Sequence, residues 1–138
     1  MSTLSSLEHR RRLPLRRRIF PLIAVAVAAP LAKMTPHRIR RVLEFARRGA
    51  RPASQRQALD ARNAVVAVSL RCAGNGCLQR SIAAALCLRA KGVWPTWRVG
   101  VRTEPFRAHA WIEVDGRPMG EPFPAGHYLP LITVAVRE

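Results

Sequence analysis

The sequence predicts an α+β fold in which helices come first and a small antiparallel sheet follows. Apolar residues recur with a helical period as far as Ala90, and after Gly92 they alternate with polar residues, as in strands. Asp115-Gly116 is in addition a strong hairpin signal between two strand candidates. The chain of 138 residues has room for one modest core, which the helices and the sheet would share.

The chain divides into a basic, partly apolar N-terminal segment, 1–33, and a domain over 34–138. The apolar run Phe20 to Ala32 contains two prolines and is too short to span a bilayer, so it predicts a buried helix and no membrane span. Arginines precede the run, which makes a signal peptide the competing interpretation. We favour a cytoplasmic protein, because three cysteines give no disulfide framework and their spacing fits reduced thiols.

Three helices are predicted within the domain. Thr35 can cap the first, and Gly49 ends it. Ser54 can cap the second. The third runs from Cys77 to Ala90, with Gly92 as its stop signal. The second helix would bury one face, which Arg62 and Ser69 interrupt and which comprises Ala58, Ala61, Val65 and Cys72.

Strands are predicted after the helices. Trp97, Val99 and Val101 alternate with Arg98, Gly100 and Arg102, and Ala108 to Val114 forms a second strand candidate. Leu131 to Val136 closes the chain as a last apolar strand. The segment Arg51 to Ala53 is predicted as a loop between the first two helices.

Cys77 is the candidate nucleophile. It directly follows the turn Gly74-Asn75-Gly76 and begins an apolar helix. Unpaired backbone N–H groups and the helix dipole favour negative charge at such a position, which lowers the pKa of a thiol. The same N–H groups can hold the oxyanion of a tetrahedral intermediate. A small buried residue at a helix start is the structural alternative.

His109 is the candidate base. Within its strand, His109, Trp111 and Glu113 share one face. A large aromatic side chain excludes water there, and the strand can present the imidazole to a thiol on a helix that packs against the sheet. Considered alone, a histidine in a strand is more often structural.

An acid that orients the imidazole would complete a catalytic triad, and the candidates are Glu113, Asp115 and Glu121. Glu113 lies four residues from His109 along the same strand, about 14 Å away at a rise of about 3.4 Å per residue. Asp115 suits the hairpin turn. We therefore favour Glu121, with Asp115 as the alternative.

The hairpin register decides whether Glu121 lies on the face of the imidazole. A two-residue turn would pair it with Ala110, on the wrong face. A three-residue loop would pair it with Trp111 and place it diagonally beside His109. We predict the three-residue loop.

A zinc site is the competing use of the cysteines. Cys77 and Cys87 would lie about 15 Å apart on one helix, too far to bind one ion, so we predict no metal and no cofactor. Cys72 and Cys87 are expected to be buried small residues. The net charge of +16 invites a nucleic-acid interpretation. An acidic protein or peptide partner, or codon bias, accounts for the same charge, and we favour these over nucleic acid.

A series of motifs runs in order from about Pro36 to Val136. In this order and spacing the motifs resemble those of the leader peptidase of lasso peptide biosynthesis, a transglutaminase-like cysteine peptidase. The motifs are Gly76-Cys77-Leu78-Gln79-Arg80-Ser81, Gly92-Val93-Trp94-Pro95-Thr96-Trp97, Val99-Gly100-Val101-Arg102, Pro105-Phe106, His109-Ala110-Trp111 and Asp115-Gly116-Arg117-Pro118.

The resemblance implies a catalytic triad of Cys77, His109 and Glu121 on a transglutaminase/papain-like core, although the acid of the family is commonly aspartate. It implies a ribosomally made precursor peptide as the substrate, whose leader is cut from its core. The short chain is similar to the catalytic half of the split form. A separate leader-recognition protein is therefore an expected partner, and an ATP-dependent macrolactam synthetase would act on the released core.

Two alternatives stay open. The same triad can pass the acyl group to an amine, as a transglutaminase-like acyltransferase does. A non-catalytic basic adaptor would instead bind nucleic acid or an acidic protein and would need no triad. The mass of the product separates the acyltransferase from the peptidase.

Overall fold

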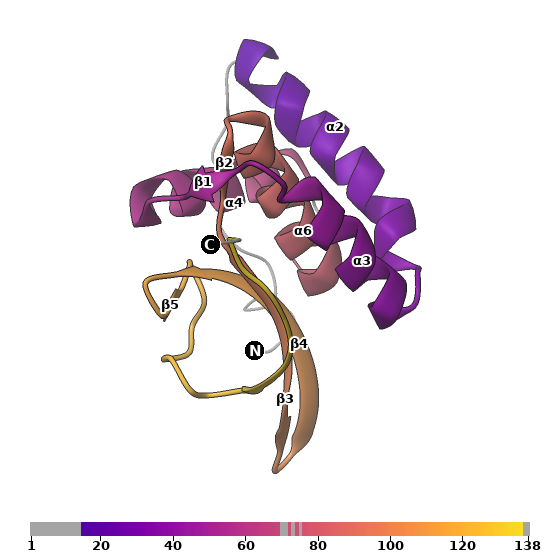
Figure 1. Cartoon of the computed structure of the whole chain (residues 1–138), viewed down its shortest axis with the longest axis vertical. Helices are drawn as coiled ribbons and strands as arrows, with labels where there is room; N and C mark the ends of the chain where they lie inside the picture. The colour runs from indigo at the N-terminus through magenta and orange to yellow at the C-terminus, as the bar shows by residue number, and fades with distance from the viewer. Residues whose placement is uncertain (1–14, 70–71, 73, 75, 137–138) are drawn as a thin grey trace.

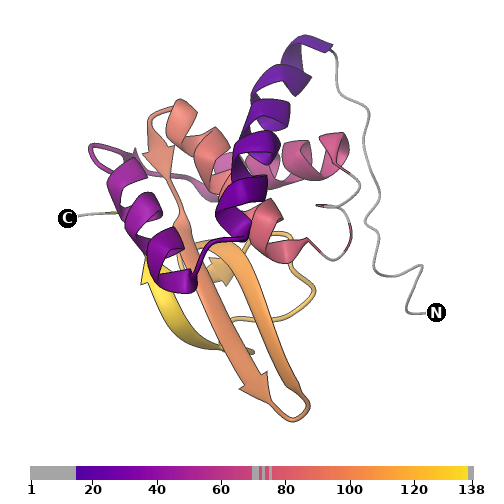
Figure 2. The same ribbon diagram turned by 90° about the vertical axis from the view of Figure 1, so that its right-hand side faces the viewer.

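The computed structural model describes residues 15–69, 72, 74 and 76–136. It consists of a layer of helices and a curved antiparallel sheet of four strands (Figures 1 and 2). The helices precede this sheet in the chain, so the predicted α+β order is confirmed.

The described helices are α2 (Leu15–Ala32), α3 (Pro36–Ala46), α4 (Gln55–Val68) and α6 (Cys77–Ala90). Two of them begin at the predicted caps. Thr35 Oγ1 accepts from the backbone N–H of Arg38, and Ser54 and Gln57 form a reciprocal capping box. The predicted bounds of the third helix of the domain match those of α6.

Helices α4 and α3 both end earlier than predicted. Ser69 has extended backbone angles and ends α4, so Cys72 does not lie on the face of that helix as predicted. Helix α3 ends at Ala46, before the predicted stop at Gly49. The predicted turn before Cys77 includes Asn75, which lies outside the described residues, as do the arginines at 10–12.

The apolar run of the N-terminal segment lies in α2, which packs against α6. Ala24 and Ala28 are buried in the common core, whereas the opposite face of α2 is exposed, so the predicted burial holds for one face only. Among the described residues, no helix has the length and apolar character needed to cross a membrane. The predicted boundary after residue 33 falls in the connection between α2 and α3.

The sheet has the strand order β5-β4-β3-β6. Central β3 pairs antiparallel with β4 on one side and with β6 on the other. The last strand begins and ends two residues earlier than the predicted Leu131 to Val136. The strands are β3 (Thr96–Thr103), β4 (Phe106–Val114), β5 (Arg117–Pro118) and β6 (Leu129–Val134).

A second, two-stranded sheet was not predicted. It pairs β1 (Arg51–Pro52) with β2 (Val93–Trp94) in parallel, in place of the predicted loop after α3. Strands of two residues carry no periodic signal. The pairing arises because α3 and α6 both end at this place, so that the Arg51 N–H can donate to the Gly92 carbonyl at 3.0 Å.

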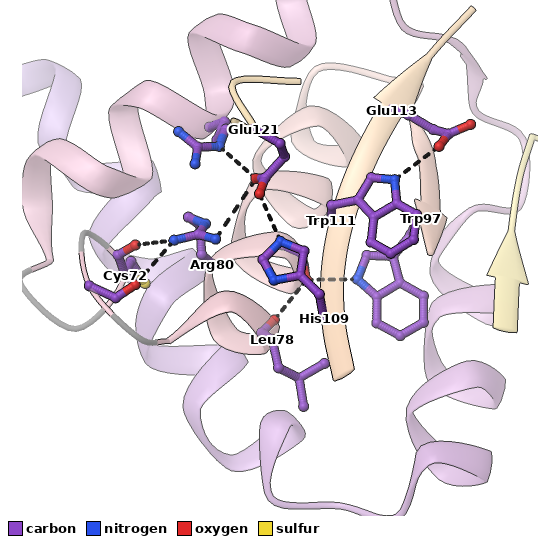
Figure 3. Close-up of polar contacts among 11 residues, drawn as sticks. Cys72, Leu78, Arg80, Trp97, His109, Trp111, Glu113 and Glu121 are labelled. Atoms are coloured by element: carbon purple, nitrogen blue, oxygen red, sulfur yellow. Dashed lines mark hydrogen bonds and ion pairs between the residues drawn. The ribbon is translucent and has the colours of Figure 1, made fainter. Parts of the chain in front are cut away.

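The core lies between the helices and the inner face of the sheet, where Trp97 packs among the buried residues of α6. The Trp97 indole Nε1 donates to Ser81 Oγ at 3.0 Å, and the Ser81 hydroxyl donates to the Leu78 carbonyl at 2.9 Å (Figure 3). These two bonds attach the first turns of α6 to β3.

Candidate active site

Cys77 is the first residue of α6. Gly76 precedes it without a side chain that could cap the helix, and the first turn holds no acidic residue. The backbone N–H groups of a first turn have no acceptor within the helix, and with the helix dipole they create a positive potential. The thiol is only partly buried. The position therefore favours an accessible thiolate.

His109 lies on β4 beside this helix end. Among the described residues, β5 pairs only with Glu113 and Val114 at the far end of β4. The edge of β4 at His109 and Ala110 is thus left open to the start of α6. The imidazole and the backbone of Ala110 lie close enough to the Cys77 sulfur for hydrogen bonding from both to lower the pKa of the thiol.

Glu121 lies on the other side of the imidazole. His109 Nε2 is 2.7 Å from Glu121 Oε1 (Figure 3). Because Nε2 faces the carboxylate, Nδ1 is the ring nitrogen left for Cys77. In the neutral ring, Nε2–H donates to Glu121, and Nδ1 can accept the thiol proton. The structure therefore brings the three predicted site residues together, with His109 between Cys77 and Glu121.

The surroundings shift the pKa values of Cys77 and His109 in opposite directions. Burial raises the pKa of the Cys77 thiol, but the bonds from His109 and Ala110 and the charges of His109 and Arg80 bring it below its ordinary 9.0. Burial lowers the pKa of His109, but the hydrogen bonds to Cys77 and Glu121 bring it above its ordinary 6.5. These shifts favour a thiolate–imidazolium pair.

Two buried arginines hold Glu121 (Figure 3). Arg62 Nε on α4 lies 3.3 Å from Glu121 Oε2, and Arg80 Nη2 on α6 lies 3.8 Å from the same oxygen. Burial raises the pKa of Glu121, but the bond to His109 and the two guanidinium groups bring it below its ordinary 4.5. The carboxylate is therefore charged, although only 3% of the side chain is exposed.

Arg80 also holds the segment that precedes the nucleophile. Its Nη1 donates to the Cys72 carbonyl at 3.0 Å and to the Gly74 carbonyl at 3.4 Å. One side chain thus connects Glu121 to the chain just before Cys77. Neither arginine was predicted as part of the site, and the one available signal was that Arg62 interrupts an apolar helix face.

The hairpin between β4 and β5 has a two-residue turn. Val114 pairs with Arg117, so only Asp115 and Gly116 form the turn, and both have positive φ angles, 54° and 76°. Such angles are required in the tight hairpin turns that match the twist of the strands. The predicted three-residue loop is therefore wrong.

Glu121 reaches the imidazole because strand pairing ends before it. β5 ends at Pro118, and Gly120 has a φ angle of 65°, at which the chain leaves the direction of the strand. Strand alternation therefore no longer determines the side on which Glu121 lies. The predicted neighbour of His109 is correct, although the predicted register is not.

The other two candidate acids are engaged elsewhere. Glu113 Oε1 accepts from the Trp111 indole at 2.9 Å. Asp115 lies in the turn, where its carboxylate accepts from Gln55 Nε2 at 3.2 Å. Glu121 is thus the candidate that contacts His109.

Aromatic rings surround the imidazole of His109. Tyr128 stacks on it with ring centroids 5.3 Å apart, Phe123 meets it edge-on at 5.3 Å, and Trp111 stacks at 6.0 Å. A dry surrounding strengthens the His109–Glu121 hydrogen bond. Trp111 was expected from the sequence, whereas Phe123 and Tyr128 belong to an irregular segment with no periodic signal.

The other two cysteines fit the predicted role of small buried residues. Cys72 and Cys87 are buried, and burial raises the pKa of Cys87 to about 11. A thiol with such a pKa is a poor nucleophile at neutral pH. Within the described ranges, no three His, Cys, Asp or Glu side chains lie close enough together to hold a metal ion.

Comparison with known protein families matches residues 21–133 to the transglutaminase-like superfamily. The match spans most of the chain, and the chain belongs to this superfamily. Members are typically enzymes, either cysteine peptidases or transglutaminases. Neither the curated proteins nor the solved structures give a match. The predicted transglutaminase-like fold is thus confirmed.

Proposed function

We propose that the chain is a cysteine peptidase that removes the leader from a ribosomally made lasso precursor peptide. The observation that supports the chemistry is the position of His109 between Cys77, at the start of α6, and Glu121, whose Oε1 lies 2.7 Å from His109 Nε2. The substrate class is supported by the ordered motifs that resemble lasso leader peptidases.

The first half of the reaction forms a thioester. His109 Nδ1 takes the thiol proton, and the Cys77 sulfur attacks the carbonyl carbon of the last leader residue. Backbone N–H groups at the start of α6 stabilise the resulting oxyanion. The peptide C–N bond then breaks, and the imidazolium donates its proton to the leaving amine of the core. Glu121 keeps the ring oriented and stabilises its positive charge.

The second half releases the leader. A water molecule gives a proton to His109 as its oxygen attacks the thioester carbon. The C–S bond breaks, the leader leaves with a new carboxylate, and the sulfur returns to the thiolate–imidazolium pair. This sequence consumes one water for each bond cut and needs no further reactant.

We also propose two partner proteins, on the basis of the resemblance, and a cytoplasmic location, on the basis of the free thiols. A separate leader-recognition protein would deliver the precursor, and an ATP-dependent macrolactam synthetase would take the released core. The nucleophile has to remain a free thiol, which favours the reducing cytoplasm.

The test is to incubate the full chain, the leader-recognition protein and the precursor in water labelled with heavy oxygen, and to measure product masses. We expect a core with a free amine and a leader whose new carboxylate carries the label, with or without a chelator. A leader joined to an added amine would establish acyl transfer instead. An unchanged precursor, with all components folded, would exclude the peptidase.

The value of kcat/KM is expected to follow a bell-shaped pH profile, because the reactive form is the thiolate–imidazolium pair. The rate rises as Cys77 loses its proton, at a pH below the ordinary thiol value of 9.0. The rate falls as His109 loses its proton, at a pH above the ordinary imidazole value of 6.5. The rate of thiol alkylation, measured across the same pH range, checks that the rise on the acid side reports the loss of the Cys77 proton. A single rise centred on the ordinary thiol value would contradict the assignment.

Gly120→Ala is expected to impair both stability and cleavage. A Cβ at this position would lie 2.8 Å from Arg62 Cδ, so Arg62 would have to move away from Glu121. Gly116→Ala is the matched control, since its φ is also positive but no atom lies within 4 Å of the added Cβ.

Both variants should lose about 1–2 kcal/mol of unfolding free energy from the left-handed backbone alone. Gly120→Ala should lose a further 1–3 kcal/mol, roughly, through overpacking, and about tenfold in kcat. Urea unfolding and cleavage kinetics measure the two effects. Equal kcat values for the two variants would show that the contact between Gly120 and Arg62 does not position Glu121.

A further inference from the structure

From Ile19 onward, the outer face of α2 is apolar. Its exposed large side chains, 47% to 65% accessible, are Ile19, Phe20, Leu22, Ile23 and Val27. The opposite face already packs on α6. A helix that is apolar on all sides is normally buried on all sides, and an apolar patch of this kind marks an interaction site.

The charges near this face are all of one sign. The sequence from residue 15 to residue 43 contains arginines and a lysine but no aspartate or glutamate. Arg17 is exposed near the start of α2, and Lys33 is exposed just after its end. Any partner of this face therefore meets positive charge at both ends of the helix.

The chemistry of the face favours lipid over protein. Protein interfaces carry about one hydrogen bond per 100–200 Å². The exposed side chains of α2 between Ile19 and Pro30 offer neither donors nor acceptors, and a helical backbone bonds internally. Hydrocarbon requires no such partners. A second copy of the chain would bring two net charges of +16 together, which opposes self-association.

We propose that α2 docks the protein onto an anionic lipid surface. Phe20 and its apolar neighbours enter the boundary between headgroups and acyl chains, while Arg17 and Lys33 contact the anionic headgroups. The helix lies on the membrane and does not cross it. The proposal is independent of the peptidase, because its measurement is binding and not cleavage.

The test compares flotation of the full chain with vesicles of phosphatidylcholine alone and with vesicles that also contain phosphatidylglycerol. We expect binding to the anionic vesicles. Phe20→Glu should weaken this binding by about tenfold or more, because a buried aromatic side chain is lost. Phe106→Glu is the matched control, since Phe106 is 72% exposed at the far end of the sheet hairpin, and it should bind as the wild type does. Arg17→Gln should lower the affinity by about fivefold.

Other results would overturn the proposal. If the wild type does not bind anionic vesicles, the partner is not a lipid surface. If binding depends on Arg17 but not on Phe20, charge attraction alone accounts for it and the apolar face does not enter the membrane. The oligomeric state is measured by sedimentation without lipid. A wild-type dimer that Phe20→Glu converts to monomers would show that a second copy of the chain covers this face. Loss of binding to the leader-recognition protein by Phe20→Glu, with vesicle binding intact, identifies a protein partner instead.

Discussion

Cys77→Ala is expected to abolish cleavage while leaving the unfolding free energy nearly unchanged. The sulfur is the attacking atom, and the side chain is too accessible to contribute much to the core. Mass spectrometry of the precursor measures cleavage, and urea unfolding measures stability. The value of kcat should fall by a factor of about 10⁶, as expected when the nucleophile of a triad is removed.

Cys87→Ala is the control for this experiment. Cys87 is buried, its pKa is raised to about 11, and it lies at the far end of α6 from Cys77. The variant should therefore keep its kcat and lose some stability, because a small cavity replaces the sulfur. If Cys77→Ala cleaved the precursor at the wild-type rate, the peptidase proposal would be wrong.

Glu121→Gln is expected to lower kcat by about 10³–10⁴, the effect of removing the charge that orients and stabilises the imidazole. The thiolate of Cys77 should also become harder to form, because His109 loses the carboxylate that raises its pKa. Cleavage kinetics and thiol alkylation against pH measure the two effects. Glu121→Asp, which keeps the charge, should restore part of the rate.

Stability has to be followed in the same variants. Glu121→Gln leaves the buried guanidinium groups of Arg62 and Arg80 without their shared carboxylate, a change that costs about 3–5 kcal/mol. Asp115→Asn is the matched control, because asparagine also accepts the positive φ of the turn. If Asp115→Asn alone removed activity from a folded protein, the assignment of the acid would be wrong.

Local chemistry in the sequence predicted much of the fold. Thr35 and Ser54 cap helices as expected, and α6 spans the predicted range from Cys77 to Ala90. These features depend on neighbours a few residues apart, so they are visible before the chain is folded. The positions of Cys77 at a helix start and of His109 on a strand follow from the same local signals.

The position of Glu121 was predicted through an incorrect register. Strand alternation with a two-residue turn would have turned this side chain away from His109. The bend at Gly120 removes that constraint, and Arg62 and Arg80 then hold the carboxylate beside the imidazole. Neither the bend nor the two arginines could be assigned from periodicity, because their partners lie on other elements.

The sequence by itself determined the order of helices and strands, the helix caps, and the local settings of Cys77 and His109. Only the tertiary structure decided which side chains complete the site. Arg62 and Glu121 meet although 59 residues separate them in the chain, and Tyr128 comes from an irregular segment. Apolar periodicity likewise could not show that one face of α2 stays exposed. Burial depends on which elements pack together, and that is a property of the whole fold.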